Sequence, residues 1–280
     1  MQKHILALIV FLEGGFMTKK CLPIAVFDSG IGGISVLKEL TLLLPNEKFI
    51  YLGDTANAPY GVKTVEKVRE LTFSVYERLK NEGIKAFVIA CNTATSAAVS
   101  ALREKYPEDI IIGVEPALKP ATKCCEHPTI AVLATPLTLK EEKFAHLLER
   151  FGSEARVIPF ACPGLVEFVE RGEVQGEALH SFLCQLLAPL ALEKLDAVVL
   201  GCTHYPFVKA EISSILGENV QIFDGSVGTA RETRRRLEEN GLLSDTDEKG
   251  SVRFIDSSYP NEKEMSCSML VKFGGEYLCN

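Results

Sequence analysis

The 280-residue sequence lacks a surplus of positive charge and lacks a long hydrophobic run. It has 30 Lys and Arg against 37 Asp and Glu, which gives a formal net charge of −7 at pH 7. Nucleic acid phosphates are bound by basic surfaces, so this balance argues against a protein that coats nucleic acid. The apolar run at residues 5–12 is also too short for a membrane, because a spanning helix needs about 20 residues. The sequence therefore predicts neither nucleic acid nor a membrane as a partner.

Cysteine is present, but not in a pattern typical of a disulfide framework. The nine cysteines are an odd number and form no C-x-x-C motif. With 47% hydrophobic and 24% charged residues, the composition is that of a globular protein with one large domain or two of ordinary size. Unpaired thiols persist in a reducing compartment, so we expect a cytoplasmic protein.

Residues 1–20 stand apart as an amino-terminal extension. The apolar run at 5–12 has the length of a short signal-peptide core, but no A-x-A cleavage site follows it. Met17 then opens the hydrophilic stretch Thr-Lys-Lys. We therefore expect that translation begins at Met17 or that residues 1–16 form a loosely attached extension.

Apolar runs alternate with helical patterns along the rest of the chain, which is typical of α/β proteins. The predicted strands are residues 23–27, 48–52, 86–90, 110–114, 129–135, 155–158, 196–200, 221–223 and 251–255. The predicted helices are residues 34–43, 64–81, 95–105, 139–151, 163–171, 176–192, a segment ending near 216, and 227–240. Thr64 is expected to cap the second helix and Gly83 to end it. Because strands buried on both faces are apolar throughout, we expect parallel sheets covered by helices.

The chain also repeats itself at the ends of its predicted strands. The segment IAVFDS resembles IAVLAT, and the segment VIACNT resembles VLGCTH. Asp28 and Thr135 are 107 residues apart, and Cys91 and Cys202 are 111 residues apart. These similar offsets predict an α/β fold of two similar parallel-sheet domains that face each other across a central cleft.

Cys91 and Cys202 both follow a predicted strand and precede a predicted helix. Ligands of open α/β sheets bind beyond the carboxyl ends of the strands, and a helix amino terminus lowers the pKa of a thiol. One thiol on each side of a ligand suits a stereoinversion, in which one group removes a proton and the other returns a proton to the opposite face. The other seven cysteines lack this setting and are predicted to be small buried hydrophobes.

Polar side chains next to the two thiols indicate an amino acid as the ligand. These side chains are Asp28, Ser29, Asn92, Thr93, Thr203 and His204. They can form hydrogen bonds with ammonium and carboxylate groups, and backbone N–H groups at helix starts can hold carboxylates.

Two other binding sites were weighed for the same residues. Residues 30–35 lack the third glycine of the G-x-G-x-x-G dinucleotide motif, and Asp28 would repel a phosphate. A zinc site formed by Cys91, Cys202 and His204 is chemically reasonable. It stays open as the weaker alternative, and we predict that the site uses no metal.

Four motifs, in this order, resemble the glutamate racemases. They are AVFDSGIGG (25–33), GDTANAPYG (53–61), ACNTAT (90–95) and GCTHYP (201–206). Members of this family interconvert L- and D-glutamate without a cofactor and supply D-glutamate for peptidoglycan. The resemblance implies two α/β domains, the second inserted into the first. The implied ranges are 21–114 plus 225–280 for the first domain, 115–224 for the second and 1–20 for the extension.

The resemblance also assigns roles to residues of this chain. It implies that Cys91 acts on D-glutamate with help from Asp28, and that Cys202 acts on L-glutamate with help from His204 and Glu170. Glu167 lies one helical turn before Glu170, and the sequence leaves open which of the two assists. The implied substrate contacts are Asp28, Ser29, Tyr60, Gly61, Asn92, Thr93, Thr203 and His204.

Three alternatives remain at this stage. An aspartate or hydantoin racemase of the same superfamily would share the motifs, and a protein that only binds an amino acid could share the fold. The two thiols favour an enzyme, because binding alone does not require them. Oligomeric state and activation by a cell-wall precursor cannot be read from the sequence, and a homodimer stays open.

Overall fold

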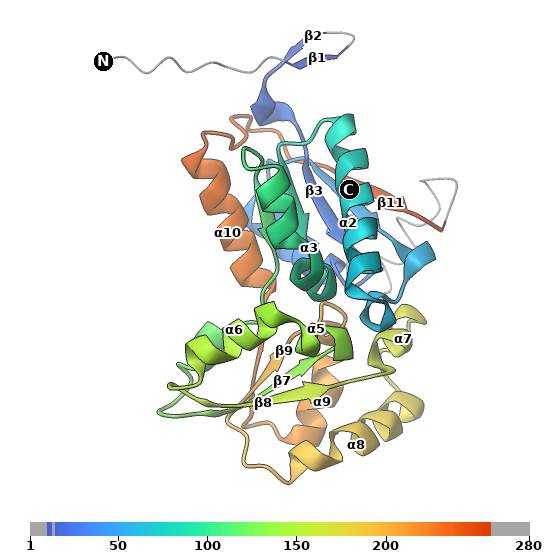
Figure 1. The fold of residues 1–280 in the computed structure, drawn as a ribbon, viewed down its shortest axis with the longest axis vertical. Helices are drawn as coiled ribbons and strands as arrows, with labels where there is room; N and C mark the ends of the chain where they lie inside the picture. The colour runs from blue at the N-terminus through green and yellow to red at the C-terminus, as the bar shows by residue number, and fades with distance from the viewer. Residues whose placement is uncertain (1–9, 13–14, 259–280) are drawn as a thin grey trace.

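Two parallel sheets form the molecule, as the alternating pattern predicted (Figure 1). The computed structural model describes residues 10–12 and 15–258. The first sheet has the order β11-β4-β3-β5-β6 and the second has the order β10-β9-β7-β8. The first consists of β3 (Ile24–Asp28), β4 (Phe49–Gly53), β5 (Ala86–Ile89), β6 (Ile111–Gly113) and β11 (Val252–Asp256). The second consists of β7 (Thr129–Ala134), β8 (Arg156–Ala161), β9 (Ala197–Leu200) and β10 (Gln221–Asp224).

All strand pairs within these two sheets are parallel. Sequential strands therefore need crossovers, and helices supply them. The predicted domain boundaries near residues 114 and 225 fall between the two sets of strands. No helix of the described residues is both long and apolar enough to cross a membrane.

Helices cover both faces of the first sheet. They are α1 (Ile34–Leu43), α2 (Val65–Glu82), α3 (Asn92–Lys105) and α10 (Ser226–Glu239). Alternate residues of β3 explain the two layers, because Ile24 and Val26 pack in one cluster with α1 and α10. Ala25 and Phe27 point the other way and pack with α2 and α3.

Six helices of the described residues accompany the second sheet. They are α4 (Leu118–Ala121), α5 (Pro136–Lys140), α6 (Glu142–Phe151), α7 (Leu165–Glu170), α8 (Glu177–Ala191) and α9 (Lys209–Leu216). Four 3-10 turns complete the description: η1 (Lys19–Cys21), η2 (Thr55–Asn57), η3 (Tyr60–Val62) and η4 (Tyr205–Val208).

The predicted helix ends are confirmed in α1 and α2, whereas the helix predicted at 139–151 is corrected. Thr64 Oγ1 accepts a hydrogen bond from Lys67 N at 3.3 Å, and Gly83 ends the helix with a φ of 87°. The expected single helix over 139–151 is instead two, because Glu141 adopts extended backbone between α5 and α6. An antiparallel pair, β1 (Val10–Leu12) with β2 (Gly15–Met17), was not predicted.

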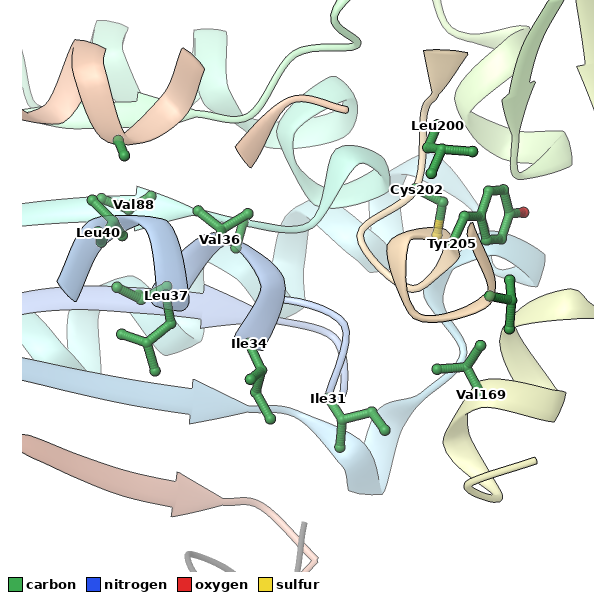
Figure 2. Packing of buried hydrophobic residues seen from close by; sticks show 14 of the residues in the cluster. Ile31, Ile34, Val36, Leu37, Leu40, Val88, Val169, Leu200, Cys202 and Tyr205 are labelled. Atoms are coloured by element: carbon green, nitrogen blue, oxygen red, sulfur yellow. The ribbon is translucent and has the colours of Figure 1, made fainter. Parts of the chain in front are cut away.

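One cluster of buried side chains joins the two sheets. Ile31 and Ile34 from the first domain belong to the same cluster as Val169, Cys202 and Tyr205 from the second (Figure 2). The carboxyl end of β3 and the turn after β9 are thereby held close together.

Candidate active site

Cys91 and Cys202 line one cavity of about 130 Å³. Cys91 follows β5, and Cys202 follows β9 after a single glycine, so each thiol lies at the carboxyl edge of its own sheet. The side chains are 5% and 7% exposed, respectively. The structure thus brings together the two residues that the repeat had paired.

The pKa of the Cys91 thiol is shifted in the direction opposite to the one that the sequence predicts. Ala94 N donates a hydrogen bond to Cys91 Sγ at 3.4 Å, and the thiol contacts Ser29 Oγ at 3.5 Å. Both contacts favour the thiolate, as predicted for a helix start. Burial, followed by the charge of Asp28, outweighs them and raises the pKa of Cys91 to about 12. The prediction of a lowered pKa is therefore wrong for this thiol.

Asp28 is fully buried and connects the two domains. Its Oδ1 accepts a hydrogen bond from Gly30 N at 2.8 Å, and its Oδ2 accepts one from Thr203 Oγ1 at 2.9 Å. Burial raises the pKa of the Asp28 carboxyl, and the nearby His204 opposes this effect. Asp28 is not among the residues that line the cavity, and its contact with substrate stays a prediction.

Cys202 begins a relay of polar groups that runs through His204 to Glu170. Cys202 Sγ lies 3.7 Å from His204 Nδ1, and His204 Nε2 lies 2.5 Å from Glu170 Oε1. Burial acts against a charged imidazole, but the contacts with Cys202 and Glu170 prevail and hold the pKa of His204 well above its ordinary value. Burial likewise opposes ionisation of Glu170, and its bond with His204 prevails and lowers the pKa of Glu170.

These contacts favour Glu170 over Glu167 as the partner of His204. Glu170 touches His204, and its Oε1 also accepts a hydrogen bond from Ile31 N at 3.1 Å. Glu167 is half-buried and lines the cavity rather than facing bulk solvent.

Two glycines in the loop after β3 allow the side chains of Glu170 and His204 to lie against the backbone of this loop. A Cβ at Gly30 would lie 1.9 Å from Glu170 Oε1, and a Cβ at Gly32 would lie 2.4 Å from His204 Nδ1. A residue with a Cβ at either position would push the side chain of Glu170 or His204 out of place. In the sequence, this loop departs from the dinucleotide motif and forms part of the AVFDSGIGG motif, but neither observation predicts its contact with Glu170 and His204.

Most predicted substrate contacts line the cavity. They are Ser29, Tyr60, Gly61, Asn92, Thr93, Thr203 and His204. Asn92 is buried, and its Oδ1 has no hydrogen bond partner among the described residues. Tyr60 OH donates to Asp54 Oδ2 at 2.6 Å, which fixes the wall formed by the first domain.

The second domain contributes lining residues that the sequence did not single out. They are Thr135, Pro136, Cys162, Pro163, Gly164 and Val166. Thr135 Oγ1 lies 3.1 Å from Thr93 Oγ1 across the two domains. Thr135 had been noticed as the strand-end counterpart of Asp28, and that symmetry was the signal that could have placed it in the site. Among the described residues, the lining includes neither lysine nor arginine.

The zinc alternative finds little support in the arrangement of these side chains. His204 Nε2 is already engaged by Glu170, while Nδ1 faces Cys202, which would be a ligand of the same metal. Within the part of the chain that the structure describes, no three His, Cys, Asp or Glu side chains are placed to hold a metal ion together.

Known proteins are similar to this chain in sequence and fold. Residues 34–233 match the family model described as Asp/Glu/Hydantoin racemase. The chain is 52% identical over 235 residues to a glutamate racemase of Clostridium perfringens, covering 84% of this chain and 90% of that one. It is 50% identical over 242 residues to one of Clostridium botulinum, covering 86% and 94%.

Solved structures agree with this assignment. Glutamate racemase isoform RacE1 from Bacillus anthracis has a TM-score of 0.78 at 35% identity, covering 85% of this chain and 89% of that one. The enzyme from Francisella tularensis in complex with D-glutamate has a TM-score of 0.76 at 31% identity, covering 87% and 90%. The chain therefore belongs to the glutamate racemases, within the Asp/Glu/hydantoin racemase family.

Proposed function

We propose that this protein interconverts L- and D-glutamate by a two-thiol acid/base reaction without a cofactor, and that it supplies D-glutamate for peptidoglycan. The observation that carries the proposal is the placement of Cys91 and Cys202, one from each domain, on a single cavity. Two acid/base groups on opposite faces of a carbon are what stereoinversion requires. Reduced thiols are needed, which supports a cytoplasmic setting.

The reaction begins at Cys202 when L-glutamate is bound. The Cys202 thiolate removes the α-proton, and the S–H bond forms as the Cα–H bond breaks. The resulting carbanion takes a proton from the Cys91 thiol on the opposite face. D-glutamate results, with Cys91 as thiolate and Cys202 as thiol, and the reverse sequence converts D- to L-glutamate.

The surroundings of the two thiols suit this starting state. A protonated His204 beside Cys202 Sγ stabilises the thiolate, and Glu170 balances the charge of the imidazolium. Cys91, with its raised pKa, rests as the neutral thiol and is ready to act as the acid. Asp28 contributes to this state, because its charge disfavours the Cys91 thiolate.

Hydroxyl and amide groups would hold the substrate. Ser29, Thr93 and Thr135 present hydroxyls to the cavity, and the unpartnered Asn92 Oδ1 offers an acceptor for the ammonium group. The backbone N–H groups at the start of α3 can bind a carboxylate.

Circular dichroism of purified protein with L-glutamate and L-aspartate in separate reactions tests the proposal. We expect the signal of L-glutamate to decay to zero, with incorporation of solvent deuterium at Cα, and L-aspartate to change little. Decay with aspartate alone would favour the aspartate racemase alternative. Binding of glutamate without decay would identify a protein that only binds the amino acid.

A chelator tests the absence of a cofactor. We expect full activity after exhaustive dialysis against a chelator, and no absorbance of pyridoxal phosphate. Loss of activity that zinc restores would contradict the two-thiol reaction and revive the site formed by Cys91, Cys202 and His204.

A further inference from the structure

Ser35 links the first domain to the turn that carries Cys202. It is the second residue of α1 and is half-buried. Its Oγ lies 2.8 Å from the carbonyl oxygen of Gly32 and 3.1 Å from the carbonyl oxygen of Thr203. The hydroxyl hydrogen is therefore shared between its own helix start and a residue of the other domain.

Thr203 stands between Cys202 and His204, so its backbone sets the position of both. Its side chain also donates to Asp28, which gives this buried residue two contacts with the first domain. Ser35 is the partner that the structure provides for its carbonyl oxygen. A buried carbonyl that loses its hydrogen bond partner shifts toward water or another donor.

The two thiols differ in how they are held. Cys91 contacts Ser29 and Ala94, which belong to its own domain. Ser35 and Asp28 hold the turn of Cys202 across the domain interface. Different residues, Thr93 and Thr135, hold the start of α3 after Cys91 across it. A change at Ser35 thus acts on one face of the substrate more than on the other.

We propose that Ser35 is a positioning residue for the Cys202 half of the reaction. It acts through the Thr203 carbonyl and fixes the Cys202–His204 turn against the first domain. This inference rests on the proposed racemase function, in which Cys202 serves L-glutamate.

Ser35→Ala removes the contact, and Ser35→Thr keeps the hydroxyl. Thr41→Ala is the matched control, because Thr41 Oγ1 donates to Lys38 O at 2.9 Å within the same helix and away from the cavity. We expect kcat/KM to fall about tenfold in Ser35→Ala, to recover in Ser35→Thr, and to stay within twofold of wild type in Thr41→Ala. An unchanged kcat/KM in Ser35→Ala would overturn the proposal.

Isotope effects separate positioning from a general loss of structure. L- and D-glutamate have equal free energies, so every variant must change kcat/KM equally in both directions. If transfer at Cys202 becomes the slower step, the deuterium effect on kcat/KM rises for α-deuterated L-glutamate and falls toward unity for α-deuterated D-glutamate. Equal changes in both directions would show that Ser35 acts on the whole site and would contradict the proposal.

Thiol labelling separates this inference from the proposed function. If wild-type protein fails to racemise glutamate, the proposed function fails, but labelling with iodoacetamide and peptide mass spectrometry still tests the contact. We expect Cys202 to react several-fold faster in Ser35→Ala than in wild type and in Thr41→Ala, with the exposed Cys184 as internal reference. Equal rates at Cys202 in all three proteins would refute the positioning role.

Discussion

Gly30→Ala should lower the activity of the protein by about one to two orders of magnitude without unfolding it. Gly30 has no positive φ, so alanine adds volume without straining the backbone. The added Cβ would lie 1.9 Å from Glu170 Oε1, which is the far end of a flexible side chain. The carboxylate can rotate away, and the fold then survives. In rotating, it leaves both His204 Nε2 and Ile31 N.

The expected size of the effect follows from the lost bond to His204. A hydrogen bond to a charged group contributes about 1.5–3 kcal/mol. If the relay is needed in the transition state, kcat/KM falls by roughly 10- to 150-fold, since about 1.4 kcal/mol corresponds to a factor of ten. Glu170→Gln should fall in the same range, because the amide cannot balance an imidazolium charge.

Racemisation of L-glutamate followed by circular dichroism measures this loss, and thermal unfolding measures stability. The control is Gly228→Ala, at an exposed position of α10 where a Cβ would meet nothing within 4 Å. That variant should keep full activity and gain up to about 1 kcal/mol in stability, because alanine favours the helix. Gly30→Ala with activity within twofold of wild type would refute the requirement for the relay.

Three further predictions concern the thiols and the core. Cys91→Ser and Cys202→Ser should each abolish racemisation. Cys91→Ser should still exchange the α-proton of L-glutamate, and Cys202→Ser should still exchange the α-proton of D-glutamate. Substantial racemisation by either variant would contradict the two-base reaction. With a pKa of about 12, Cys91 is thiolate in only about one molecule in ten thousand at pH 8. The rate at which Cys91 is alkylated, measured by peptide mapping, should therefore still rise about tenfold per pH unit up to pH 10. A plateau of this rate near pH 9 would contradict the raised pKa. Lys85 forms a fully buried ion pair with Glu47; Lys85→Met should lower the free energy of urea unfolding by about 3–5 kcal/mol, and adding Glu47→Leu should recover much of it.

The meeting of Cys91 and Cys202 could be predicted because it depends on local signals. Strands buried on both faces are continuous apolar runs, and the residue after such a run lies at the carboxyl edge of the sheet. The helical stretch predicted after the Gly-rich turn also has the observed bounds of α1, Ile34–Leu43. Repetition of this pattern in two halves then placed one thiol in each domain.

The electrostatics of the thiols could not be predicted in the same way. A helix start favours the Cys91 thiolate, but burial of the thiol and the charge of Asp28 depend on how neighbouring strands and loops pack around it. The bond between His204 and Glu170 also requires residues far apart in the chain. Such effects depend on tertiary packing, which no local pattern of residues reveals.

The absence of lysine and arginine from the described lining has a consequence for release. If ion pairs held the two carboxylates of glutamate, the substrate would be bound tightly before and after inversion alike, and such uniform binding lowers KM without raising kcat. Hydroxyl and amide donors hold each mirror form only moderately. Either enantiomer can then leave the cavity as readily as it entered, and a reaction without thermodynamic preference can run in whichever direction the cell draws the product.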